Sequence, residues 1–155
     1  MAENLRIAEG GKNEKYELLY KQIAAVVAEE SDPIANMANV SSMLHQTFGF
    51  WWTGFYRVVG GELVLGPFQG PMACTRIAKG RGVCGTAWSE EHTIVVEDVD
   101  KFPGHIACSS LSRSEIVVPV WHDCDIIGVL DIDSEHLATF DSTDQEWLER
   151  IVQLL

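Results

Sequence analysis

The sequence predicts an α+β fold, in which a central, mostly antiparallel sheet is accompanied by helices from both ends of the chain. Apolar residues follow helical spacing only near the two ends, whereas the middle holds short β-branched or aromatic runs separated by glycines and prolines. With 155 residues, the chain has the length of one ordinary domain. We therefore expect a flexible N-terminus over residues 1–13 and a single domain over residues 14–155.

Two amphipathic helices come first. Between Tyr16 and Val27, apolar residues recur with the period of a helix. Asp32 and Pro33 then indicate a second start, because a polar N-cap followed by proline in the first turn favours a helix. We expect this second helix to end at Gly49.

The strands predicted in the middle of the chain are short, and each ends at a turn signal. They span residues 51–59, 62–65, 73–77, 93–96, 115–121 and 125–132. Gly60-Gly61 is typical of a hairpin turn. The glycine-rich segment 80–85 leads into a short helix, and a last helix follows the capping sequence at 140–144.

Composition and charge exclude several kinds of partner. Eleven Lys and Arg residues against 23 Asp and Glu residues give a net charge of −12. This charge repels phosphate backbones, so we expect no nucleic acid partner. No apolar run has the length of a membrane span, and the first residues lack the profile of a secretory signal. Four cysteines without such a signal indicate working thiols in a reducing compartment, so we expect a cytoplasmic protein with no membrane partner.

Cys108 is the first candidate for a reactive thiol. It lies in the long loop predicted for residues 97–114 and is followed by two serines. A core cysteine normally lies inside an apolar element, because a thiol behaves there as a small hydrophobe. We therefore expect the sulfur of Cys108 to be accessible to a solute, as a reactive cysteine requires. Loops of this length are uncommon in compact domains and usually serve binding or catalysis.

The other three cysteines have different surroundings. Cys84 lies near the start of the short helix beside Arg81, which favours a thiolate, although a small buried packing residue is the alternative. Cys74 falls in a predicted strand, where a core role and a redox role are equally compatible with the sequence. Cys124 lies in a hairpin turn between two acids, and we treat it as a bystander. Because Cys74 and Cys84 are ten residues apart, they do not form the close pair of a structural zinc site, and we expect no metal.

Three carboxylates are predicted to meet at the end of the last hairpin. Asp131 and Asp133 lie two residues apart and so share one face of a strand. Glu115 begins the preceding strand, and the turn at 122–124 pairs the two strands, which brings Glu115 beside this segment. Such a cluster repels, or shares a proton and binds a cation, and a raised pKa would provide a general acid near neutral pH. The alternative is a solvated group of charges at a strand end.

Aromatic residues dominate the first strand. Trp52 and Tyr56 share one face of it, whereas Trp51 and Phe55 share the other. One of the two sets must belong to the core. The other could line a pocket for an apolar group such as a methyl thioether, since sulfur against an aromatic ring is mildly favourable.

Six ordered motifs resemble those of the free methionine-(R)-sulfoxide reductases, which are stand-alone GAF-domain enzymes. They are Trp52-Thr-Gly-Phe-Tyr56, Leu65-Gly-Pro-Phe-Gln-Gly70, Gly80-Arg-Gly-Val-Cys-Gly85, His105-Ile-Ala-Cys108, Ser114-Glu-Ile-Val-Val-Pro119 and Ile127-Gly-Val-Leu-Asp-Ile-Asp-Ser134. Each motif alone is a weak signal, but their shared order makes a chance match improbable. The resemblance extends from about Tyr16 to the C-terminal end of the chain.

The resemblance implies a fold and an activity. The fold is an antiparallel sheet with the N- and C-terminal helices packed on one side and a pocket covered by the long loop. The activity is the reduction of free, not peptide-bound, methionine-(R)-sulfoxide by an enzyme that is recycled by thioredoxin. Such enzymes are usually dimeric, so we expect a homodimer.

The resemblance also implies roles for particular residues. Cys108 matches the attacking cysteine, and Cys84 and Cys74 are the candidates for the resolving cysteine. The residues implied to bind the substrate, with the acids also assisting proton transfer, are Trp52, Tyr56, Glu115, Asp131 and Asp133.

Sulfur chemistry supports these roles. A sulfoxide oxygen leaves only when it is protonated, so a nearby carboxylic acid is needed as a general acid. Attack by a thiolate then leaves a cysteine sulfenic acid, which a second thiol converts to a disulfide. Neither a metal nor an organic cofactor is required.

The alternative function is a non-catalytic GAF sensor module that binds a small ligand such as a cyclic nucleotide. The net charge of −12 argues against a phosphate ligand. The three candidate catalytic thiols would also have no role in a sensor. An interaction domain with incidental cysteines would explain these thiols even less.

Overall fold

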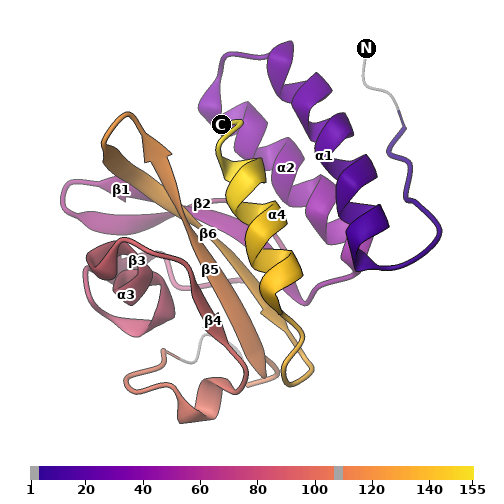
Figure 1. The fold of residues 1–155 in the computed structure, drawn as a ribbon. Helices are drawn as coiled ribbons and strands as arrows, with labels where there is room; N and C mark the ends of the chain where they lie inside the picture. The colour runs from indigo at the N-terminus through magenta and orange to yellow at the C-terminus, as the bar shows by residue number, and fades with distance from the viewer. Residues whose placement is uncertain (1–3, 107–109) are drawn as a thin grey trace.

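The computed structural model describes residues 4–106 and 110–155. The elements along this part of the chain, shown in Figure 1, are α1 (Lys12–Ala28), α2 (Pro33–Phe48), β1 (Trp52–Val59), β2 (Glu62–Gln69), β3 (Arg76–Ala78), α3 (Gly82–Glu90), β4 (Ile94–Val96), a 3-10 helix (Val99–Lys101), β5 (Ser114–His122), β6 (Asp125–Ser134) and α4 (Ser142–Val152). None of the helices among the described residues is long and apolar enough to cross a membrane.

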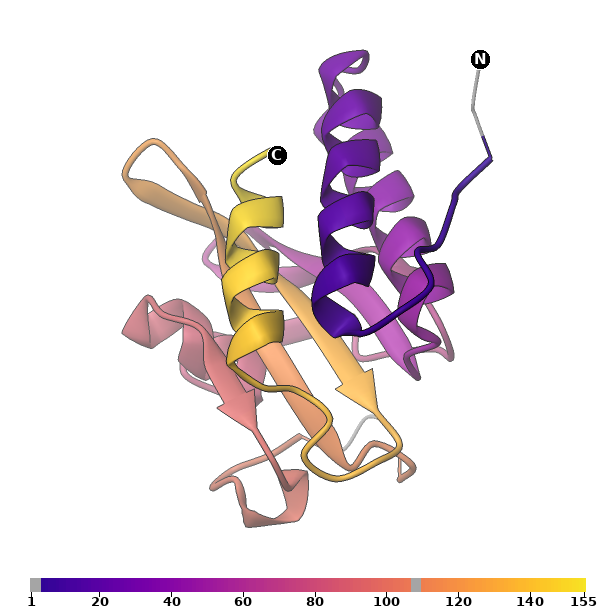
Figure 2. The ribbon, with the colours of Figure 1, turned by 45° about the vertical axis from the view of Figure 1, so that its right-hand side comes forward.

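The strands form one antiparallel sheet with the order β3-β2-β1-β6-β5-β4. Helices α1, α2 and α4 lie together on one face of this sheet, whereas α3 lies on the opposite face (Figures 1 and 2). The predicted α+β class is therefore confirmed, as is the prediction that helices from both ends of the chain pack on one side.

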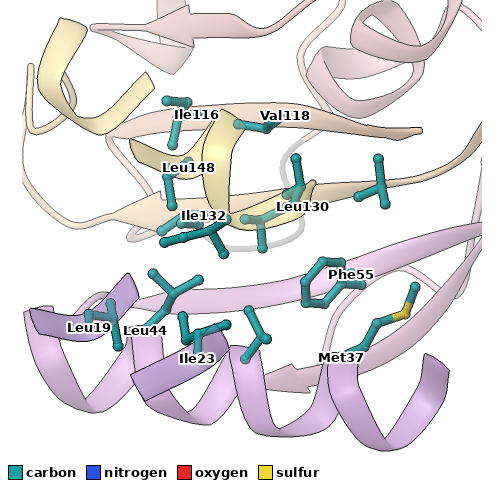
Figure 3. Packing of buried hydrophobic residues seen from close by; sticks show 14 of the residues in the cluster. Leu19, Ile23, Met37, Leu44, Phe55, Ile116, Val118, Leu130, Ile132 and Leu148 are labelled. Carbon is teal, nitrogen blue, oxygen red and sulfur yellow. The ribbon is translucent and has the colours of Figure 1, made fainter. Parts of the chain in front are cut away.

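Both faces of the sheet are buried, because alternate residues of each strand point to opposite sides. The cluster under α1, α2 and α4 includes Leu19, Leu44, Phe55, Ile132 and Leu148 (Figure 3). The cluster on the side of α3 includes Tyr56, Val83, Ala87, Val117 and Val129. A polar side chain on the α3 side of the central strands is therefore held between the sheet and the elements that cover it.

Helix α2 starts and stops where its sequence signals lie. The Asp32 carboxylate accepts a hydrogen bond from the backbone N–H of Ala35 at 2.9 Å, and Pro33 is the first helical residue. Gly49 follows the last turn in a left-handed conformation, with φ of 66°. The predicted bounds of this helix are confirmed.

Helix α1 begins at Lys12, before the predicted start at Tyr16 and inside the segment 1–13. The described residues before it form no helix or strand. The backbone N–H and carbonyl of Arg6 nevertheless both bond to the side chain of Gln22, at 2.8 Å each. The flexibility of this segment stays a prediction.

A buried polar network joins α1 to α4. The hydroxyl of Tyr16 donates to one carboxylate oxygen of Asp144 at 2.6 Å, and the ammonium of Lys12 donates to the other at 2.6 Å. Asp144 is only 1% exposed and also closes the capping box of α4 with Asp141. Charge-assisted hydrogen bonds thus connect α1 and α4, which lie far apart in the sequence.

Strand β2 continues to Gln69, although a turn was predicted after Leu65. Two residues, Gly66 and Pro67, lie opposite Phe55 alone, since the ladder passes from the Tyr56–Leu65 pair to the Gly54–Phe68 pair. This is a β-bulge, and a bulge tolerates a proline that a regular ladder would reject. The Gly-Pro signal therefore indicates a bulge here and not the end of the strand.

Strand β3 spans only Arg76–Ala78, although residues 73–77 were predicted. It pairs with β2 along Glu62 to Val64. Cys74 consequently lies in the loop before the strand, so its predicted place inside a strand is wrong. The remaining strands begin and end within two residues of their predicted bounds.

Candidate active site

A second bulge brings three carboxylates onto one face of the sheet. The ladder between β5 and β6 shifts by one residue at Ile127, which has no partner in β5. Glu115 is therefore opposite Asp133. A regular ladder continued from the turn would place Glu115 opposite Ile132, on the face that packs against α1, α2 and α4. The predicted proximity of Glu115 and the two aspartates is confirmed, and the bulge is its cause.

Two of the three acids are buried together with one thiol, and Asp133 is half-buried beside them. Glu115 and Asp131 are each 6% exposed, so a solvated cluster of charges is excluded. Asp131 is hydrogen-bonded to both Glu115 and Cys84. One atom from each of these three side chains lies within 4.8 Å of the other two. Asp133 accepts a hydrogen bond from the hydroxyl of Ser112 at 3.0 Å.

One oxygen of Asp131 lacks a partner. Its Oδ1 atom is buried and has no hydrogen bond to any of the described residues. A buried carboxylate oxygen without a donor is unfavourable, and native proteins rarely leave one. Asp131 also lines a cavity, so a molecule bound there can supply the missing donor.

The environment raises the pKa of all three acids, but not to the same extent. Burial, followed by the charges of Asp131 and Asp133, raises the pKa of Glu115 well above its usual range. Burial and the charge of Asp131 do the same to the pKa of Asp133, against the hydrogen bond from Ser112. Burial also raises the pKa of Asp131, but hydrogen bonds from the neighbouring carboxyl and thiol oppose it. Asp131 is thus the acid whose ionised form is opposed least by its surroundings, and Glu115 is the one whose neutral form is favoured by every influence on its pKa.

Cys84 is a protonated thiol. It occupies the third position of α3 and is 4% exposed. Burial raises the pKa of its thiol well above the usual range, and the charges of Asp131 and Glu115 raise it further. The thiolate predicted from the helix N-terminus and Arg81 is therefore wrong, because burial and nearby carboxylates outweigh the helix dipole.

Trp52 and Tyr56 form an aromatic wall on the same side of the sheet as the acids. Their rings stack with centroids 5.9 Å apart, and both side chains are buried. The indole N–H of Trp52 donates to the carbonyl of Pro71 at 3.0 Å. The hydroxyl of Tyr56 donates to the carbonyl of Cys74 at 2.9 Å. The wall therefore also holds the loop that carries Cys74.

The cysteines fall into distinct states. Cys74 is half-buried and disulfide-bonded. Cys84 and Cys124 are free thiols, and Cys124 is exposed in the turn between β5 and β6. Cys108, predicted to be the attacking cysteine, lies outside the described residues.

The acids and the aromatic wall line one cavity of about 60 Å³. A single water needs about 10–15 Å³ by this measure, so the cavity suits a small molecule. Gly82 and Val83, at the N-terminus of α3, also contribute to its lining. One side of the cavity is thus aromatic, another is acidic, and a third presents the first turn of a helix.

Two functional candidates were missed in the sequence. His105 places its Nε2 atom 3.7 Å from a carboxylate oxygen of Glu115, and Ser112 bonds to Asp133. Both belong to the long segment that leads into β5, so the described part of this loop contributes to the lining of the pocket, whereas a cover over the pocket stays a prediction. The sequence signal that could have identified these two residues is a long loop with polar residues just before a strand that begins with acidic Glu115.

The chain has relatives along nearly its whole length. The GAF domain family matches residues 39–155. GAF domain-containing protein A of Dictyostelium discoideum is 58% identical over 156 residues, which cover 100% of this chain and 99% of the relative. The free methionine-R-sulfoxide reductase of Escherichia coli is 45% identical over 145 residues, which cover 93% of this chain and 88% of the relative.

A solved structure agrees closely with this fold. The X-ray structure of the free methionine-R-sulfoxide reductase of Neisseria meningitidis, in complex with its substrate, matches with a TM-score of 0.95 and 54% identity. The match covers 97% of this chain and 92% of that chain. With identity at this level over nearly the whole chain, the chain belongs to the GAF domain family and, within it, to the free methionine-R-sulfoxide reductases.

Proposed function

We propose that this protein reduces free methionine-(R)-sulfoxide to methionine. The observation that carries the proposal is the cavity in which carboxyl groups with raised pKa values and an aromatic wall lie together. Its acidic side suits the ammonium of a free amino acid and is unfavourable for a cyclic nucleotide, whose phosphate is anionic. Relatives named for this activity support the same function.

Asp131 is the proposed binding group for the substrate ammonium. Its Oδ1 atom has no partner among the described residues, and an ammonium group supplies the missing donor. The methyl end of the substrate would contact Trp52 and Tyr56, since sulfur and methyl groups pack favourably on aromatic rings. The substrate carboxylate would face the N-terminus of α3 near Gly82, where backbone N–H groups favour an anion.

In the proposed first step, Cys108 attacks the sulfur of the sulfoxide. The S–O bond of the substrate breaks, and the oxygen ends as the hydroxyl of a sulfenic acid on Cys108. The substrate sulfur gains two electrons and leaves as methionine, while the cysteine sulfur loses two. Glu115 is the proposed general acid, because every influence identified on its pKa raises it, whereas Ser112 partly offsets the rise for Asp133.

Cys74 is the proposed resolving cysteine. Its thiol condenses with the sulfenic acid of Cys108, which forms a disulfide and releases water. Cys74 is disulfide-bonded in the structure, whereas Cys84 is a free thiol with a raised pKa and is therefore a poor nucleophile. Cys84 instead serves as a hydrogen-bond partner of Asp131.

The cellular setting belongs to the same proposal. A disulfide formed in each turnover has to be reduced by an external dithiol, and thioredoxin fits this role. A disulfide that forms transiently during catalysis suits the cytoplasm, where structural disulfides are rare. The proposed assembly is a homodimer, which follows the family resemblance and is tested by analytical ultracentrifugation.

The test is a thiol count during turnover without a recycling reductant. Reduced protein is mixed with racemic free methionine sulfoxide, and methionine and free thiols are measured together. We expect two thiols to be lost per methionine formed, with only the R-epimer consumed. Cys108→Ser should abolish methionine formation, whereas Cys124→Ser should behave as wild type. Unchanged thiols together with saturable nucleotide binding would instead support the sensor function.

A further inference from the structure

Three donor atoms of the kind that bind metal ions converge in the pocket. They come from Cys84 on α3, Glu115 on β5 and Asp131 on β6, and each lies within 4.8 Å of the other two. Tetrahedral coordination with bonds of about 2.0–2.3 Å would place such atoms about 3.3–3.8 Å apart. Small rotations of these side chains would therefore be enough to enclose one ion.

A second observation points to a bound cation. The Oδ1 atom of Asp131 is buried without a hydrogen-bond partner among the described residues, and Asp131 is only 6% exposed. The same residue lines the cavity, so a solute that enters the cavity can reach its side chain. Among the described residues that line the cavity, Arg81 carries a positive charge, and the imidazole of His105 contacts Glu115 at 3.7 Å.

We propose that these three residues form a binding site for Zn²⁺ or a similar thiophilic divalent ion, and that the bound ion excludes the substrate from the pocket. Binding of the ion displaces the proton of the Cys84 thiol to solvent, and the resulting thiolate selects borderline and soft ions over Mg²⁺ and Ca²⁺, which prefer oxygen ligands. Three protein ligands leave a fourth coordination position for water, as in catalytic zinc sites. The exclusion of substrate rests on the proposed function, whereas the binding of the ion does not.

The spacing of these residues explains why sequence patterns do not indicate the site. Close cysteine pairs mark structural zinc sites in a sequence, and this chain has none. The three ligands instead come from a helix and two strands that the bulge in β6 brings into register. Asp131 and Glu115 are also the proposed contacts of the substrate, so an ion and a substrate compete for the same atoms.

The test uses Co²⁺ as a spectroscopic probe for the full-length, reduced protein. A cobalt–thiolate bond produces a near-ultraviolet charge-transfer band, and displacement by Zn²⁺ then reports the zinc affinity. We expect one ion per chain in the wild type and in Cys124→Ser and Cys108→Ser. Cys84→Ser should lose the band, and Asp131→Asn should weaken Zn²⁺ binding at least about tenfold. Circular dichroism of each variant confirms that it is folded.

Competition is measured with Cys108→Ser, which should bind methionine sulfoxide without converting it. Rising concentrations of the sulfoxide should raise the apparent dissociation constant of Zn²⁺ in proportion. A band that survives Cys84→Ser, or an affinity unchanged in Asp131→Asn, would overturn the ligand assignment. Absence of metal binding in a protein that still reduces the sulfoxide would overturn this inference alone. Metal binding without competition would overturn the exclusion and the proposed location of the substrate.

Discussion

The hydroxyl of Tyr56 connects the aromatic wall to the loop that carries Cys74, through a hydrogen bond of 2.9 Å. Tyr56→Phe removes this hydroxyl and nothing else, because the ring is 2% exposed and keeps its packing against Trp52. We predict that the variant forms its catalytic disulfide more slowly, since Cys74 is the proposed resolving cysteine and is held by this bond.

The size of the effect follows from the hydrogen bond. A neutral hydrogen bond contributes about 0.5–1.5 kcal/mol, and a carbonyl left without a donor costs about 1–3 kcal/mol. We therefore expect Tyr56→Phe to lower the free energy of unfolding by about 1–3 kcal/mol. For a domain of this size, the Tm should fall by about 2–12 °C. If the same 1–3 kcal/mol is lost from the conformation that positions Cys74 for reaction, disulfide formation slows by about 5- to 140-fold.

The assay is a single turnover that is quenched at successive times, with methionine and free thiols counted in each sample. Methionine release should keep its wild-type rate, while the loss of the second thiol lags behind. Tyr20→Phe is the matched control, because it removes a hydroxyl from α1, away from the pocket. If Tyr56→Phe lowers the Tm but loses both thiols at the wild-type rate, the bond does not position Cys74.

Three further substitutions test other parts of the structure. Wild-type activity should fall as pH rises through the raised pKa of Glu115, because a general acid must be protonated, and Glu115→Gln should be slow at every pH without that fall. The pKa of Glu115 is higher in the folded than in the unfolded protein, so the contribution of Glu115 to stability is complete below the unfolded pKa and is lost as pH rises through the folded pKa. The Tm of Glu115→Gln should therefore exceed that of the wild type most at alkaline pH. Gly128→Ala places a Cβ 2.4 Å from the carbonyl oxygen of Tyr56 and should cost about 1–3 kcal/mol in urea unfolding. Tyr16→Phe should cost about 1.5–3 kcal/mol in the same measurement, since its hydroxyl bonds to the charged Asp144.

Each of these expectations has a control or an outcome that contradicts it. Gly11→Ala is the control for Gly128→Ala, because its new Cβ would approach only the flexible end of Glu14, at 3.1 Å. Tyr20→Phe serves again for Tyr16→Phe. An alkaline fall in activity that persists in Glu115→Gln would assign the proton donor elsewhere. Equal stability of Gly128→Ala and the wild type would show that β1 and β6 are not held in close contact there.

Local signals in the sequence were enough to predict the fold class and most element bounds. The start of α2 at Asp32 and its end at Gly49 depend on a side-chain cap and on a left-handed glycine, and both act within one turn of helix. The two bulges could not be predicted in the same way. Ile127 and the Gly66-Pro67 pair are unpaired because of how neighbouring strands align, which is a property of the assembled sheet.

The candidate site was predicted in its residue types but not in its electrostatics. The proximity of Glu115 to Asp133 depends on the one-residue shift at Ile127, so counting from the turn alone would place Glu115 on the opposite face. The ionisation of Cys84 was wrongly predicted for a related reason. Its local sequence favours a thiolate, whereas its burial and its contact with Asp131, from another element, favour the thiol.

The location of the substrate is tested most directly by a crystal structure of Cys108→Ser with bound methionine-(R)-sulfoxide. We predict that the substrate ammonium lies within hydrogen-bond distance of Asp131 Oδ1, with the methyl group against Trp52 and Tyr56. Substrate bound outside this cavity, or bound with its carboxylate against the acids, would contradict the account.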